Sequence, residues 1–252
     1  MCDSSSTECD RLISHIEKST IGLTEAALGP SSYWASLPLC VVDSVFSIGV
    51  KYYPGVENVV VRWCESQSPR WEQESRSKPT SDVGPTVTEF IEIINRRLDG
   101  GCTYENLFHN KWRTSSRNGI LKAEAVHLFA KELLACGINR FTDVRDHKKL
   151  AVAEKRLKGI PGQRSGLSFK YFQMLIGEED YVKSDRHVRR FVSDALCIDW
   201  SRLVSPERAE ELAKEAAYKL KNDYPGLTPA RLDLAIWNYQ HTLTKPSPSC
   251  SD

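Results

Sequence analysis

The stretch GIPGQRSGLSFKYFQMLIGEEDYVKSDRHVRRF, residues 159–191, combines a tight turn, a short apolar helix and one carboxylate in a basic segment. Pro161-Gly162 predicts a sharp turn, because proline fixes φ and glycine tolerates a left-handed backbone. A helical pattern precedes the turn, and a second one follows from Ser165, the expected N-cap, to a stop at Gly177. We therefore predict a helical hairpin over about residues 151–177.

Asp185, a carboxylate set among basic residues near the end of this stretch, stands at the start of an amphipathic pattern. Val188, Phe191, Val192 and Leu196 share one face of the predicted helix. Aspartate is a preferred N-cap residue, and its charge suits the positive end of a helix. Capping is the simplest role for Asp185, and a cap would also hold the carboxylate at a fixed point for chemistry.

Basic residues are concentrated around the same stretch. Residues 155–190 contain nine Lys or Arg and four Asp or Glu, a local charge of +5, so the rest of the +1 chain carries −4. A basic patch on a nearly neutral protein is a sign of phosphate binding. Charge alone favours the simpler interpretation, a solvated helical face.

The remaining sequence predicts an all-α fold. Residues 87–98 and 121–133 carry apolar side chains at helical spacing and end at glycines. Further helices are expected over 9–28, 206–224 and 227–240, and polar loops over 66–86 and 109–119. The segment VVVRW, residues 59–63, is β-prone, but Pro54 before it suits a first helical turn.

Composition excludes several classes of protein. Eight cysteines are scattered singly without a C-x-x-C, which argues against a zinc ribbon or a thioredoxin-type site and indicates reduced thiols. No apolar run is long enough to cross a membrane. The segment MCDSSSTECDR at the start has no apolar core, so residues 1–8 are expected to be a disordered tail. We expect a cytoplasmic (nucleoid-associated) or nuclear protein that is not secreted.

The order of these elements resembles the helix-hairpin-helix (HhH-GPD) superfamily of DNA glycosylases. Its signature is a hairpin with Pro-Gly, an apolar helix ending at glycine, a short loop, and an aspartate at a helix start, here Asp185. Fainter similarities are GILKAEAV at residues 119–126 and DSVFSIGVKY at residues 43–52. The resemblance spans roughly residues 40–196 and is closest over residues 159–191.

The resemblance implies an all-α, two-lobed fold with a cleft between the lobes. Residues 40–182 would form a helical barrel lobe that contains the hairpin. Residues 9–39 together with 183–245 would form the second lobe, after the disordered tail. The cleft would hold Asp185.

The resemblance also implies a monofunctional DNA glycosylase. Such an enzyme flips a damaged or modified base out of duplex DNA and hydrolyses its N-glycosidic bond. Asp185 takes the catalytic position, where a carboxylate stabilises the positive charge that develops on the deoxyribose and orients the attacking water. Two alternatives stay open: a non-catalytic DNA-binding protein that uses the hairpin for phosphate contacts, and a structural or interaction protein that retains the scaffold.

The expected DNA-binding residues lie in the hairpin and around Asp185. They are Pro161, Gly162, Gln163, Arg164, Ser165, Gly166, Lys170, Lys183, Arg186 and His187. Candidates for the base pocket, or for a wedge that fills the gap left by the flipped base, are Tyr33, Trp34, Phe46, Lys51 and Tyr52. The simpler role for the aromatic members of this set is in the core.

Three departures from the family pattern refine these expectations. Arg164 replaces a second hairpin glycine, Gly166 stands where bifunctional members carry a Schiff-base lysine, and only Cys197 and Cys250 follow Asp185. We therefore expect no AP-lyase activity, no iron–sulfur cluster and no metal at the chemical step, although a structural monovalent cation at the hairpin is compatible with the resemblance. The expected partner is double-stranded DNA, bound by a monomer without membrane association.

Overall fold

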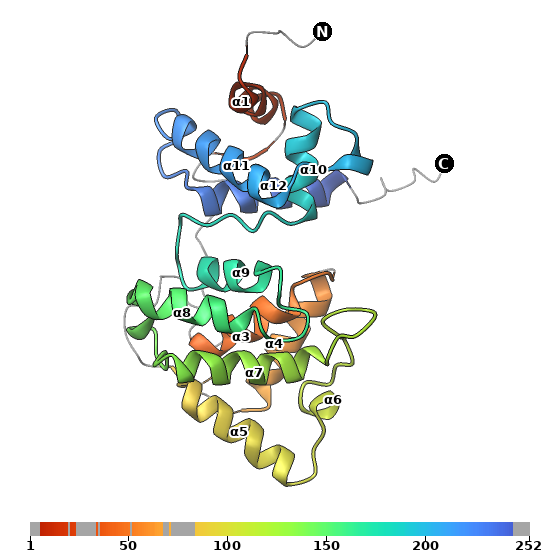
Figure 1. Ribbon diagram of the computed structural model, residues 1–252, viewed down its shortest axis with the longest axis vertical. Coiled ribbons are helices and arrows are strands. Elements are labelled where there is room, and N and C mark those ends of the chain that lie inside the picture. Colours follow the sequence, from red (N-terminus) through yellow and green to blue (C-terminus); the bar gives the residue numbers. More distant parts are fainter. Residues whose placement is uncertain are drawn as a thin grey trace, which may run out of the picture. The chain divides into compact units, whose positions relative to one another are not determined.

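The computed structural model describes residues 6–19, 21–23, 34, 36–50, 52–67, 71 and 84–243. Within these ranges the protein is all helical, apart from loops and one isolated bridge between Arg113 and Leu121 (Figure 1). The all-α prediction is confirmed. No helix in these ranges has the length and apolar character needed to cross a bilayer.

Contacts between residues divide the chain into two compact units. One is Ser31–Gly177, and the other combines Met1–Pro30 with Glu178–Asp252. The lobe boundaries expected from the resemblance, after residues 39 and 182, lie nine and five residues beyond these divisions, which fall after residues 30 and 177. The two-lobed arrangement and its cleft stay predictions.

The unit Ser31–Gly177 is built around α3 (Leu37–Phe46), whose sequence LPLCVVDSVF is almost continuously apolar and whose ten residues are all buried. Helices α7 (Lys122–Ala135) and α9 (Leu167–Leu175) pack against α3, and α5 (Val87–Asp99) packs against α7. The other helices of this unit are the π-turn η1 (Tyr52–Val56), α4 (Glu57–Glu65), α6 (Tyr104–Leu107), the 3-10 turn η2 (Asp143–Arg145) and α8 (His147–Leu157).

The β-prone segment at residues 59–63 is helical. Val59, Val60 and Trp63 all turn toward the core, which requires helical and not alternating spacing. Pro54 lies in η1, immediately before α4, where the missing N–H of proline costs little. The tertiary environment thus overrides the β-propensity of three consecutive valines.

A buried lysine closes the C-terminal end of α3. Lys122 Nζ donates hydrogen bonds to the carbonyl oxygens of Phe46, at 2.7 Å, and Ile48, at 2.6 Å. The last carbonyls of a helix have no partner within the helix, so the ammonium satisfies groups that burial would otherwise leave unpaired. Burial lowers the pKa of Lys122 to about 8. The GILKAEAV segment therefore contributes an internal cap to the core of this unit.

The second unit joins the two ends of the chain. Its helices are α1 (Glu8–Lys18), α10 (Arg186–Ala195), the 3-10 turn η3 (Trp200–Arg202), α11 (Pro206–Leu220) and α12 (Pro229–Leu243). Helix α1 packs against α11 and α10, while α12 packs against α10 and α11. Leu12 and Ile16 of α1 are buried in the same core as Phe191 of α10.

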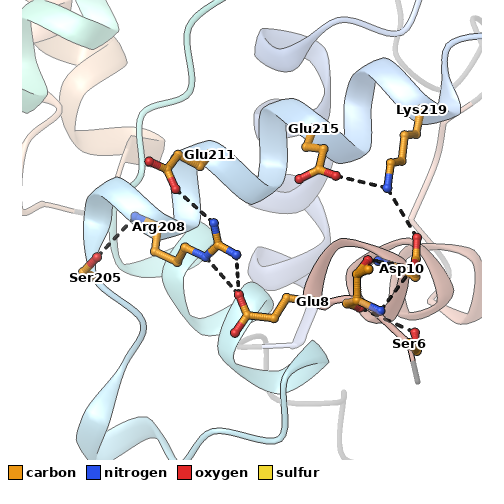
Figure 2. A network of polar contacts seen from close by, with 9 residues as sticks. Ser6, Glu8, Asp10, Ser205, Arg208, Glu211, Glu215 and Lys219 are labelled. Atoms are coloured by element: carbon orange, nitrogen blue, oxygen red, sulfur yellow. Dashed lines mark hydrogen bonds and ion pairs between the residues drawn. The ribbon is translucent and has the colours of Figure 1, made fainter. Parts of the chain in front are cut away.

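Polar contacts also link α1 to α11 (Figure 2). Arg208 lies 2.6 Å from Glu8 and 3.0 Å from Glu211, and Lys219 lies 3.4 Å from Asp10. These side chains are solvent-exposed, so water and salt screen their attraction. The buried apolar face of α1 therefore supplies most of its attachment to this unit.

Helix α1 is shorter than predicted. It begins at Glu8, capped by the Thr7 side chain, and ends at Lys18. The Ser19 hydroxyl donates a hydrogen bond to the His15 carbonyl at 2.7 Å and its backbone is extended, a local alternative to helix that serine favours. The predicted helix over 9–28 is therefore wrong for residues 19 and 21–23. Residues 24–28, residues 1–5 of the predicted tail and most of the 66–86 loop lie outside the described residues.

Candidate functional site

The turn between α8 and α9, residues 158–166, exposes its backbone to solvent. Pro161, Gly162, Arg164 and Ser165 are all exposed. The N–H groups of Gly162, Arg164 and Ser165 make no hydrogen bond to any described residue. Backbone N–H groups with no internal partner at the start of a helix are available to an anion such as phosphate.

Gln163 holds this turn together from inside. Its N–H donates to the Ile160 carbonyl at 2.9 Å, and its own carbonyl accepts from the Gly166 N–H at 3.0 Å. Its buried side chain accepts a hydrogen bond from the Ser168 hydroxyl. Gln163 is one of the residues expected to contact DNA. In the structure it supports the turn, and its side chain does not face solvent.

Glycine is required at position 162. Its φ of +84° lies in the left-handed region. A Cβ atom there would lie 2.3 Å from Thr114 Cβ and 2.4 Å from Thr114 Oγ1. The turn therefore packs directly against the 109–119 loop, which is irregular as predicted.

The N-cap of α9 is Gly166, so the prediction that Ser165 caps this helix is wrong. Gly166 has a φ of +73°, which a residue with a side chain rarely adopts. The Ser165 hydroxyl accepts a long hydrogen bond, 3.4 Å, from the Leu167 N–H. The left-handed glycine shifts the start of the helix by one residue and leaves Ser165 in the exposed turn.

The basic residues around the turn differ in their freedom to bind a ligand. Arg156 pairs with Glu132 at 2.5 Å, and Lys158 pairs with Glu154 at 2.8 Å. The exposed guanidinium of Arg164 makes no hydrogen bond or ion pair with the described residues. Arg164 is therefore better placed than Arg156 or Lys158 to bind an anion at the turn.

Asp185 is the N-cap of α10, as predicted. One carboxylate oxygen accepts the His187 N–H at 2.8 Å, and the other lies 3.5 Å from Lys183 Nζ. The side chain of Asp185 is 22% exposed. The carboxylate is thus held on two sides and still reaches solvent.

The three basic residues expected to contact DNA near Asp185 have different environments. The Lys183 ammonium is nearly buried beside Asp185. Arg186 is exposed. His187 is half-buried against Trp237 of α12, and burial lowers its pKa, although the Asp185 charge opposes this shift. The geometry leaves Arg186 the most accessible of the three for a phosphate.

Helix α12 adds a residue to this site that the sequence interpretation missed. Asp233 is buried, and its carboxylate accepts the Lys183 N–H at 3.0 Å. Burial first, and then the charge of Asp185, raise the pKa of Asp233 to about 7. The signal in the sequence was an acid on the apolar face of LTPARLDLAIWNYQ, between Leu232 and Ile236.

The pocket candidates that the structure describes belong to the core. Phe46 is fully buried beside Phe108. Trp34 is buried, and its Nε1–H donates to Asp43 at 2.8 Å. This burial supports the core alternative for both residues. Tyr33, Lys51 and the side chain of Tyr52 lie outside the described residues.

The described residues contain no group of three or more His, Cys, Asp or Glu side chains arranged to hold a metal ion. The cysteines among them, including Cys197 after Asp185, are free thiols.

A family model described as a domain of unknown function, DUF8548, matches residues 10–241. Comparison with curated proteins and with solved structures found no match. Because the family model covers nearly the whole sequence, this chain belongs to the DUF8548 family.

Proposed function

We propose that this protein is a monofunctional DNA glycosylase in which Asp185 is the catalytic carboxylate. The observation that carries the proposal is the environment of Asp185. Its carboxylate is partly exposed, accepts the His187 N–H and pairs with the Lys183 ammonium. It follows the α8–α9 hairpin in the order that resembles HhH-GPD glycosylases. The activity itself rests on this resemblance and on the chemistry below.

A fixed carboxylate suits hydrolysis of an N-glycosidic bond. The reaction breaks the bond between the sugar C1′ and the base nitrogen, adds the hydroxyl of water to C1′ and leaves the proton with the base. Positive charge builds on the sugar as the bond breaks, and a preorganised negative charge stabilises it. The same carboxylate can orient the attacking water by accepting its proton in a hydrogen bond.

The α8–α9 turn suits the DNA backbone. The exposed N–H groups of the turn and the Arg164 guanidinium match the charge and geometry of a phosphate. Such contacts hold a duplex in place without reading its sequence. The base itself would be selected elsewhere, by a pocket that receives it after flipping.

A second candidate function is non-catalytic DNA binding. The exposed turn and Arg164 favour it, because phosphate contacts need no carboxylate at position 185. The two functions differ in one product, the abasic site.

A screen of duplex oligonucleotides tests the proposal. Each duplex carries one alkylated, deaminated, oxidised or bulky modified base and is incubated with the protein, then treated with alkali. We expect at least one duplex to be cut at the modified base, and only after alkali, because Gly166 offers no amine for a Schiff base. Trapping of a covalent adduct at the hairpin by borohydride would contradict the absence of lyase activity. Binding of all duplexes without any cut would support the non-catalytic function.

Neutralising the hairpin should weaken DNA binding without regard to the lesion. We expect Arg164→Gln with Lys170→Gln to lower affinity by similar factors for damaged and undamaged duplex. The slope of log K against log salt should become shallower by about 0.9 for each phosphate that the variant no longer neutralises. Fluorescence anisotropy at several salt concentrations measures both quantities.

A control for this experiment is Arg96→Gln with Lys131→Gln, which removes the same charge from exposed positions on α5 and α7. If the turn contacts the DNA backbone, this control should keep the wild-type slope of log K against log salt. Loss of lesion binding alone in the hairpin variant, with non-specific affinity unchanged, would mean that the turn contacts the base.

A further inference from the structure

Helix α12 is tied to Asp185 through one residue. The buried Asp233 carboxylate accepts the N–H of Lys183 at 3.0 Å. The side chain of the same lysine ends 3.5 Å from the Asp185 carboxylate. Two carboxylates therefore share Lys183, one through its backbone and charge and the other through its ammonium.

The charges that act on Asp233 come from the segment that precedes α10 and from α11. Asp185 and Lys183 precede α10, and Glu210 lies on α11, where it pairs with Lys214 at 3.2 Å. Burial and the charges of Asp185 and Glu210 favour the neutral form of Asp233, while Lys183 favours the ionised form. Because the resulting pKa of Asp233 is about 7, this carboxyl group gains or loses its proton near neutral pH.

We propose that Asp233 is a positioning residue for Asp185. The Asp233 carboxylate fixes the backbone at Lys183, and its ionisation controls how far the Lys183 ammonium neutralises the catalytic carboxylate. This inference rests on the proposed glycosylase function. With Asp233 neutral, the cluster contains one ammonium and one carboxylate, and Lys183 compensates Asp185. With Asp233 ionised, the two carboxylates share one ammonium and the cluster carries a net charge of −1.

The net charge has a direct consequence for glycosidic bond cleavage. An additional negative charge near Asp185 stabilises the cationic sugar in the transition state. The rate of base release should therefore rise as Asp233 loses its proton. A residue with a purely structural role would not give the rate this dependence on pH.

The ionisation of Asp233 should also change the stability of the folded protein, and this effect can be measured without any enzymatic activity. The pKa of Asp233 in the folded protein lies above the ordinary value of 3.8. Its contribution to stability is therefore complete below about pH 4 and is lost as pH rises through about 7. Asp233→Asn cannot ionise, so its urea midpoint relative to wild type should rise between pH 5 and pH 8.

The test is the pH profile of the single-turnover rate for wild type, Asp233→Asn and the control Asp199→Asn. The amide introduced by Asp233→Asn retains an oxygen that can accept the Lys183 N–H, and Asp199 is an exposed capping residue outside the cluster. We expect the wild-type and control rates to rise roughly tenfold with a midpoint near pH 7, an effect of about one nearby charge. The Asp233→Asn rate should stay near the low-pH rate of wild type. A profile identical to that of wild type would overturn the inference.

A second variant tests the positioning role. Asp233→Ala removes the acceptor, so hydrogen exchange at the Lys183 amide should accelerate about tenfold or more, and base release should slow at every pH. Unchanged exchange at Lys183 would overturn the positioning role. Failure of the wild-type protein to release any base would contradict the proposed function, whereas normal release with an unaltered Asp233→Asn profile would contradict this inference alone.

Discussion

Replacing Asp185 with asparagine is expected to lower the single-turnover rate of base release by about 100-fold or more, the cost of removing one electrostatic stabiliser from an active site. Asparagine can still cap α10 through its side-chain oxygen, because it ranks with aspartate as an N-cap residue. It has no negative charge to oppose the developing cation. The measurement uses protein in excess over duplex, so that product release does not enter the rate.

The fold of this variant should be retained. Lys183 loses an ion-pair partner, but the Asp185 charge is also one cause of the raised pKa of Asp233. Removing that charge lets Asp233 ionise at lower pH and compensate the lysine. The matched control is Asp199→Asn, since Asp199 caps η3 by accepting the Ser201 N–H at 2.8 Å. Both variants should unfold with a wild-type urea midpoint to within a small shift, and a near-wild-type rate for Asp185→Asn would remove this residue from the mechanism.

The largest effect on stability is expected for Gly162→Ala. A left-handed backbone costs an alanine about 1–2 kcal/mol, and overpacking against Thr114 adds about 1–3 kcal/mol. The contact of 2.3 Å to Thr114 Cβ cannot be relieved by rotating a side chain, because both atoms are attached directly to the backbone. Urea unfolding should therefore show a loss of about 2–5 kcal/mol.

Gly101→Ala separates the two causes. Gly101 has nearly the same φ, +85°, and no atom of a described residue lies within 4 Å of the position of its added Cβ. This control should lose only the backbone contribution, about 1–2 kcal/mol. Equal losses for the two variants would mean that the α8–α9 turn does not pack against Thr114.

Local signals in the sequence were sufficient to predict the helices α8 and α9 and the cap at Asp185. Glycine and proline define the ends of α8 and α9, and an aspartate before an amphipathic pattern defines the start of α10. The errors were also local: the left-handed Gly166 displaced the predicted cap at Ser165, and the Ser19 hydroxyl ended α1 early. Such choices between competing hydrogen bonds cannot be read from periodicity.

The role of Asp233 could not be predicted because it depends on contacts between distant parts of the chain. Asp233 meets Lys183 across 50 residues of sequence, and the Lys122 ammonium meets the Phe46 carbonyl across 76. The neighbouring residues do not identify the group that either buried side chain contacts. An acid or a lysine on the apolar face of a predicted helix is the one hint available, and it does not identify the partner.

The most direct test of glycosylase activity is detection of the free base. DNA containing alkylated, deaminated, oxidised and bulky bases is incubated with wild type or Asp185→Asn, and mass spectrometry identifies the released bases while abasic sites are counted in the same sample. We expect wild type to release one free base for each abasic site formed. Asp185→Asn should release less free base, by a factor of about 100 or more. Tight binding of the DNA by wild type with no free base and no abasic site would contradict the catalytic role of Asp185.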